Sequence, residues 1–173
     1  MSTRADYTVE EWEAIRRTPA EAVVAIEQAS KSSFLGRRRE RKATEKGFKQ
    51  AIEQFSGLAL LEAIVAASEE EGRLIDALRA SDEPLIDRAI ESARAARRAI
   101  NAKGSREEAE AFANAVILTC ERVAEASSER GEDRTISHAE GLLLKRIGEA
   151  LGIAGYEPPN VNWVGLAPVR DDV

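Results

Sequence analysis

The fold class follows from residues 135–153, which read Thr135-Ile-Ser-His-Ala-Glu-Gly-Leu-Leu-Leu-Lys-Arg-Ile-Gly-Glu-Ala-Leu-Gly-Ile153. Ser137 and Glu140 have the spacing of a capping box, in which each side chain accepts a hydrogen bond from the other residue's backbone N–H group. After this box, apolar residues recur every three or four positions, at Leu143, Ile147, Ala150 and Leu151. The stretch therefore predicts an amphipathic helix that begins after Ser137.

The same features recur along the chain. Three further capping boxes are predicted, at Thr8 and Glu11, Thr18 and Glu21, and Ser105 and Glu108. No segment alternates polar and apolar residues as a strand would, and Ala, Leu, Ile, Glu and Arg dominate the composition. Residues 58–67 are apolar on nearly every side, so we expect them in a central helix. The sequence thus predicts an all-α fold, a single-domain bundle of about six helices over residues 1–155.

Residues 156–173 differ from the rest of the chain. They contain three prolines and show no helical period, yet they keep large apolar side chains at Val161, Trp163, Val164 and Leu166. Such a composition is typical of an extended segment that docks on a surface rather than of a disordered one. We therefore predict an extended C-terminal tail, with Trp163 at least partly buried on its own bundle or on a neighbouring chain.

The charge distribution limits the classes of partner. The net charge is −6, and it divides into +3 for residues 1–50 and −9 for residues 51–173. This balance does not fit a general nucleic-acid binder, so we expect no nucleic-acid partner. No apolar run approaches the roughly 20 residues of a membrane helix, and residues 1–7 lack the apolar stretch of a secretory signal. We therefore expect a cytoplasmic protein.

Catalytic chemistry has few candidates in this sequence. His138 is the single histidine and Cys120 the single cysteine. A di-iron bundle needs Glu-x-x-His pairs on facing helices, which one histidine cannot supply. Cys120 falls on the apolar stripe of its predicted helix, where a buried and unreactive thiol is expected. We therefore expect a protein that is not an enzyme and holds no cofactor.

A basic cluster follows Phe34-Leu35 and consists of Arg37, Arg38, Arg39, Arg41 and Lys42. It could contact an anionic membrane surface or an acidic partner, because each such contact is electrostatic. The alternative is a solvated helix start whose arginines pair with nearby glutamates. No aromatic residues are interleaved with the cluster in the way that nucleic-acid stacking requires.

An acidic turn precedes the helix that is predicted to begin after Ser137. Glu132, Asp133 and Glu140 offer carboxylate oxygens, the ligands that Ca²⁺ and Mg²⁺ prefer. They are the candidate metal ligands of the chain. The alternative is a capped helix end whose carboxylates are solvated.

Two resemblances involve these residues. The run Asp133-Arg-Thr-Ile-Ser-His-Ala-Glu140 resembles the repeated Asp-Gly-x-Ile-x-x-x-Glu motif of TerB-like proteins, the all-helical domain associated with tellurite resistance, with Arg134 in place of the glycine. In that family the acidic residues of the motif are implicated in metal binding. Much of residues 7–153 is also similar to a group of uncharacterised bacterial helical proteins, in segments such as Tyr7-Thr-Val-Glu-Glu-Trp12 and Ile147-Gly-Glu-Ala-Leu-Gly-Ile153.

Together these features predict a non-enzymatic helical interaction or scaffold protein of the cytoplasm, for which the TerB resemblance implies a stress- or envelope-linked role. The alternative is a TerB-like domain that binds a divalent cation at residues 132–140. The expected partners are another protein, a second copy of the chain, or an anionic membrane surface. Trp163 and the basic cluster are the candidate interaction residues.

Overall fold

The computed structural model describes residues 2–29, 57–66, 68–81, 83–127 and 135–163. These residues form a short 3-10 helix and six α-helices, with no strand among them. The elements are η1 (Arg4–Asp6), α1 (Val9–Ala29), α3 (Ala59–Ala66), α4 (Ser68–Ala80), α5 (Ile86–Lys103), α6 (Arg106–Ser127) and α7 (His138–Ala150). The predicted all-α bundle is therefore confirmed.

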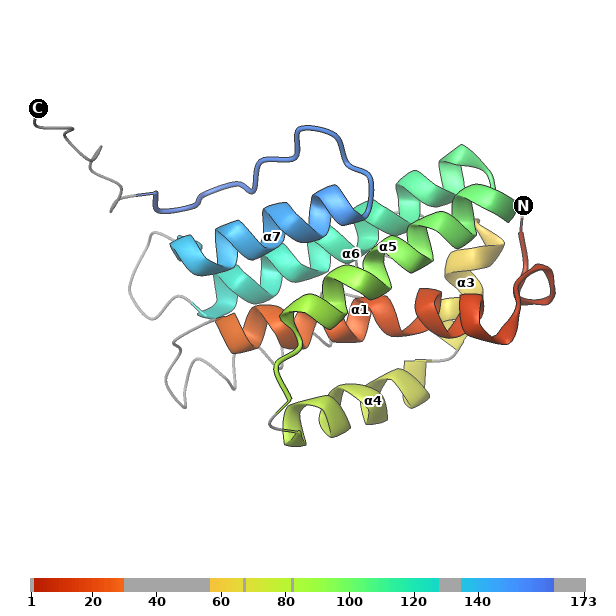
Figure 1. The fold of residues 1–173 in the computed structure, drawn as a ribbon, viewed down its shortest axis with the longest axis horizontal. Helices are drawn as coiled ribbons and strands as arrows, with labels where there is room; N and C mark the ends of the chain where they lie inside the picture. Colours follow the sequence, from red (N-terminus) through yellow and green to blue (C-terminus); the bar gives the residue numbers. More distant parts are fainter. Residues whose placement is uncertain (1, 30–56, 67, 82, 128–134, 164–173) are drawn as a thin grey trace, which may run out of the picture.

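Helix α1 is the element around which the others pack. It contacts α4, α5, α6 and α7, and its contact with α5 is the most extensive (Figure 1). The burial pattern explains this position, because residues 18–26 of α1 are all buried. A helix that is covered along so much of its surface belongs inside the bundle.

The capping box predicted at Thr18 and Glu21 would begin a new helix there, and this prediction is wrong, because α1 continues through Pro19. Proline removes one hydrogen bond of the helix ladder, and here the chain tolerates that loss inside a long packed helix. The Thr18 hydroxyl does not cap a helix start; it donates to the carbonyl oxygen of Ala14, one turn earlier in α1, at 2.7 Å. Glu21 does not cap Thr18 and takes a different role, described below.

Residues 58–67 are less central than their composition predicted. Leu58, Leu60, Leu61 and Ile64 are buried, but Glu62 and Ala66 are exposed. Helix α3 packs on α4 and α6. The chain turns at Gly57, whose φ of +96° suits glycine, so α3 begins only at Ala59.

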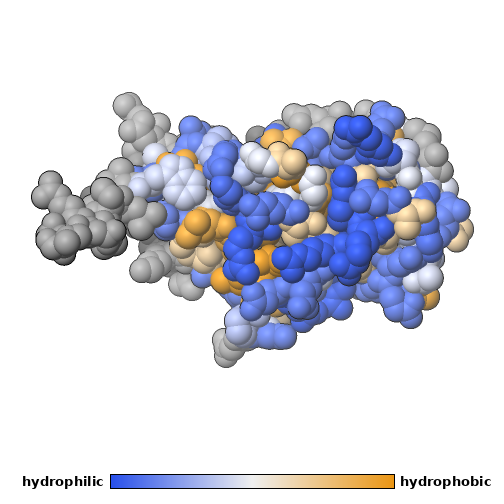
Figure 2. All heavy atoms as spheres, turned by 45° about the horizontal axis from the view of Figure 1, so that its top comes forward, coloured by the Kyte–Doolittle hydropathy of each residue, from blue (hydrophilic) through white to orange (hydrophobic). Residues whose placement is uncertain are grey.

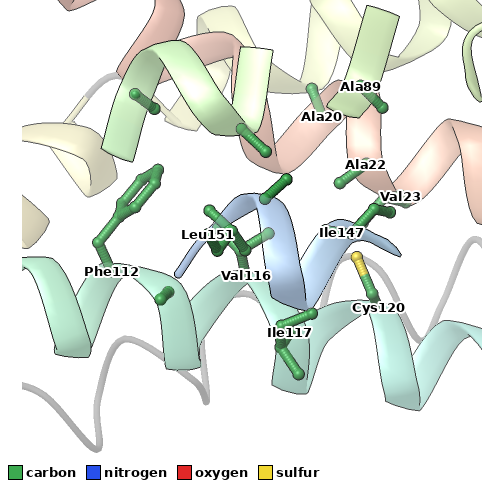
Figure 3. Packing of buried hydrophobic residues seen from close by; sticks show 14 of the residues in the cluster. Ala20, Ala22, Val23, Ala89, Phe112, Val116, Ile117, Cys120, Ile147 and Leu151 are labelled. Carbon is green, nitrogen blue, oxygen red and sulfur yellow. The ribbon is translucent and has the colours of Figure 1, made fainter. Parts of the chain in front are cut away.

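The hydrophobic core lies where α6 and α7 meet α1 and α5. Phe112, Val116 and Cys120 project from α6 toward side chains of the other helices (Figure 3), and Ile117 is buried in the same cluster. Many of the facing residues are alanines, including Ala20, Ala22 and Ala89. Small side chains let the helix axes approach closely. The core can therefore pack tightly although it contains few aromatic residues.

Three of the four predicted capping boxes are present. In each, the glutamate carboxylate accepts a hydrogen bond from the backbone N–H of the first residue of the box. These distances are 2.8 Å for Thr8 and Glu11, 2.8 Å for Ser105 and Glu108, and 2.9 Å for Ser137 and Glu140. These boxes begin α1, α6 and α7, as the sequence predicts.

Residues 155–163, which we call the C-terminal strap, lie along α7 (Figure 1). Two glycines of α7 make this packing possible. A Cβ atom on Gly148 would come within 2.5 Å of the Tyr156 ring, and one on Gly141 would come within 2.6 Å of Val161. A parallel bridge joins Val161 to Ile136 just before α7. Residues 156–163 form no helix, as predicted for the tail; residues 164–173 lie outside the described residues.

Candidate functional site

Several predicted site residues lie outside the described residues: Arg37, Arg38, Arg39, Arg41 and Lys42 of the basic cluster, and Glu132 and Asp133 of the acidic turn. Both the membrane-surface hypothesis and most of the cation hypothesis therefore stay predictions. His138, Glu140 and Trp163 are described, and all three lie at the start of α7 or on the strap beside it.

Glu140 is buried in its own cap. Its Oε2 atom accepts hydrogen bonds from both the backbone N–H and the hydroxyl of Ser137, and 1% of the residue is exposed. Within the described part of the chain, no three His, Cys, Asp or Glu side chains come close enough together to hold a metal ion. In the structure Glu140 thus performs the capping role that its spacing predicts.

Cys120 is fully buried among apolar side chains, and its sulfur points into the core (Figure 3). Burial strongly raises the pKa of its thiol, and the nearby carboxyl groups of Glu121 and Glu27 add to this effect. The thiol therefore stays protonated at neutral pH and is a poor nucleophile.

Trp163 stands at the end of the strap with 42% of its surface exposed. Its indole meets the His138 ring in a T-shaped contact, with 5.3 Å between ring centroids. The sequence predicts that Trp163 is at least partly buried on its own bundle or on a neighbouring chain; in the structure it contacts its own bundle at His138 but is among the exposed large hydrophobic residues. Leu142, which is 46% exposed, lies one helical turn after His138 on the same side of α7. We call Trp163, His138 and Leu142 the Trp163 patch.

The backbone around the bridge fixes the place of the Trp163 patch. Ile136 donates its N–H to the Asn160 carbonyl and accepts from the Asn162 N–H, both at 3.0 Å. Val161 packs on Gly141, two residues before Trp163. These contacts place the backbone that leads to Trp163 beside the start of α7, where the indole meets His138.

A second anchor of the strap lies nearer its start. The Tyr156 hydroxyl donates to Oε1 of Glu121 on α6, at 2.5 Å. Burial raises the pKa of Glu121, while the Tyr156 hydrogen bond acts in the opposite direction. Lys145 of α7 pairs with Glu157 of the strap on the solvent side. The strap is thus tied to both α6 and α7.

The structure reveals a buried ionic network that the sequence did not indicate. Glu21 of α1 is 1% exposed, and its carboxylate accepts hydrogen bonds from Arg17 at 3.1 Å, Arg88 at 2.9 Å and Ser92 at 2.5 Å. Two of these partners lie on α5. The network therefore connects α1 to α5. The Glu21 carboxylate takes part in hydrogen bonds that hold these two helices together.

An open depression of about 500 Å³ lies beside this network, between α1 and α5. Ala14 and Ala95 contribute small side chains to it, and Glu91, Arg94 and Arg98 stand around them with Ser92. Arg94 and Arg98 are exposed. The depression is shallow and charged, and it does not have the enclosed apolar character of a small-molecule site.

Comparisons with protein-family models, with curated proteins and with solved structures find no match to this chain. Among the described helices, none has the length and apolar character to cross a membrane.

Proposed function

We propose that this protein is a non-enzymatic interaction protein that binds another protein through the Trp163 patch. The observation that carries the proposal is an indole that is 42% exposed and packs against the His138 ring. Tryptophan is enriched among the residues that dominate binding energy at protein interfaces. An indole that is already positioned loses little conformational freedom on binding.

The surroundings of the indole support this proposal. Leu142 adds a large apolar side chain on the same side of α7. The molecular face in Figure 2 is mostly hydrophilic, with a few small hydrophobic areas. An apolar centre within a polar rim is the usual composition of a transient interface. We expect the partner to present an apolar pocket for the indole.

The buried polar groups support a structural rather than a catalytic role. Glu21, Glu108 and Glu140 are buried, and hydrogen bonds within the bundle occupy each of them. The Cys120 thiol is kept protonated by its raised pKa. A catalytic carboxylate or thiol would instead face a cleft with room for substrate. The expectation that the protein works in the cytoplasm rests on its sequence alone.

Photo-crosslinking in the native host tests the proposal. A photoreactive phenylalanine analogue is placed at position 163, at position 142, or at the control position 9, where Val9 is 75% exposed on α1. We expect one discrete crosslinked partner from positions 163 and 142, and its loss when excess unlabelled chain competes. Equal crosslinking from position 9, or none from position 163, would contradict the proposal.

The alternative function is binding of Ca²⁺ or Mg²⁺ at residues 132–140, as the TerB resemblance implies. It requires Glu132 and Asp133 to supply the oxygens, because the Glu140 carboxylate is held by Ser137. A cation would have to share or displace those hydrogen bonds. This candidate therefore ranks second.

A further inference from the structure

The outer side of α5 carries three charged residues that form no ion pair within the described part of the chain: Glu91, Arg94 and Arg98. Other charged residues of α5 do form ion pairs. Arg88 pairs with Glu21 and Glu83, and Asp87 pairs with Arg146. A stripe of charges without an ion pair among the described residues therefore runs along the middle of α5, whereas Asp87, Arg88 and Lys103 of the same helix form ion pairs.

The spacing of these residues puts them on one side of the helix, because positions three, four and seven residues apart lie on one face. Arg94 and Arg98 are one turn apart, and like charges at that spacing repel each other. Ala95 lies between them, and with Ala14 of α1 it lines the open depression. The stripe thus combines charged side chains that form no ion pair among the described residues with a place where another helix can approach closely.

We propose that this stripe is a homodimer interface, in which α5 packs antiparallel against α5 of a second copy. The two-fold axis then passes between positions 94 and 95. Glu91 of each copy faces Arg98 of the other, so the same ion pair forms twice. A two-fold interface must be self-complementary in this way, and the charges of the stripe satisfy that condition.

This arrangement also gives the depression between α1 and α5 a role in the dimer. Arg94 of the second copy lies opposite Ala95, where the small side chains of Ala95 and Ala14 leave space for its long aliphatic part. A larger residue at either position would close that space. The second copy also brings a carboxylate beside Arg98, which relieves the repulsion between Arg94 and Arg98.

Sedimentation velocity on the full chain tests this interface, at concentrations up to about 1 mM, the range in which weak complexes assemble. We expect a monomer–dimer equilibrium that weakens as salt is added. Glu91→Arg should raise the dimer dissociation constant by about tenfold or more, because it places like charges opposite each other at two sites. Arg98→Glu should do the same.

The double variant Glu91→Arg/Arg98→Glu restores both ion pairs with reversed polarity, and it should return the dissociation constant to within about threefold of the parent value. Glu110→Arg makes the same charge change at an exposed position of α6 and should leave the dimer intact. Trp163→Ala should also leave it intact, so the Trp163 patch and this interface can fail independently. A monomer at every concentration, an effect of Glu110→Arg as large as that of Glu91→Arg, or a double variant without rescue would each overturn the proposal.

Discussion

Glu21 in α1 and Glu140 in α7 are both buried carboxylates, but they are held in different ways. Glu140 receives its hydrogen bonds from Ser137, three residues earlier in the chain. Glu21 receives them from Arg17 on its own helix and from Arg88 and Ser92, about 70 positions later. The first arrangement starts a helix, and the second joins two helices. Local contacts therefore define where α7 begins, whereas long-range contacts define how α1 and α5 pack.

Removing Glu21 should give the largest effect. Glu21→Ala leaves the guanidinium of Arg88 and the hydroxyl of Ser92 without their buried acceptor. We expect a loss of about 2–4 kcal/mol in the free energy of unfolding, less than for a fully buried pair because the Arg17 and Arg88 side chains are 33% and 35% exposed. Urea denaturation followed by circular dichroism measures it. The matched control is Glu13→Ala on the same helix, whose ion pair with Arg16 is partly exposed and should contribute less than about 1 kcal/mol. Equal losses for the two variants would contradict the network.

Adding a methyl group to α7 where the strap packs on it should give an intermediate effect on stability. Gly148→Ala forces a Cβ atom against the Tyr156 ring, and we expect a loss of about 1–3 kcal/mol because the strap must shift. Amide exchange across the strap should then increase. Gly72→Ala in α4 is the control, since nothing lies within 4 Å of its added Cβ, and it should stabilise by up to about 1 kcal/mol. Unchanged stability in Gly148→Ala would mean that the strap is not seated on this glycine.

Weakening the local cap should give a smaller effect than removing Glu21. Ser137→Ala deletes the hydroxyl that accepts from the Glu140 N–H, and such losses average about 1 kcal/mol. Ser137→Asp keeps a capping oxygen and should restore most of the loss. Thermal unfolding of the three proteins measures the difference. A loss in Ser137→Ala as large as in Glu21→Ala would remove the distinction between local and long-range anchoring.

The difference between the two carboxylates also explains which parts of the fold could be predicted from sequence. The boxes at Ser105 and Ser137 were predictable because both partners lie within one turn. The box at Thr18 was predicted wrongly, because α1 had already begun at Val9 and tertiary packing carries it through Pro19. The Glu21 network could not be found, since its partners on α5 are distant in sequence. Gly141 and Gly148, two turns apart on one side of α7, were the available signal for a segment packed against that helix.

The smallest expected effect concerns the acidic turn. Because Ser137 holds the Glu140 carboxylate, we expect Ca²⁺ or Mg²⁺ at millimolar concentration to leave the melting temperature unchanged. Binding that favoured the folded state would raise it. A rise that Asp133→Asn removes would contradict this expectation and support the TerB-like alternative. Calorimetry of the same pair of proteins gives an independent reading.

The two tryptophans give the most direct test of the proposed function, because Trp12 is 6% exposed and Trp163 is 42% exposed. In Trp12→Phe, Trp163 becomes the sole indole, and its time-resolved fluorescence anisotropy reports whether the ring is fixed. The proposed function requires an indole that is both fixed and accessible. We predict that the anisotropy decays mainly with the tumbling of the whole molecule, while iodide still quenches the emission. Fast local depolarisation like that of a free peptide would contradict the account, because an indole that moves freely is not a preformed binding residue.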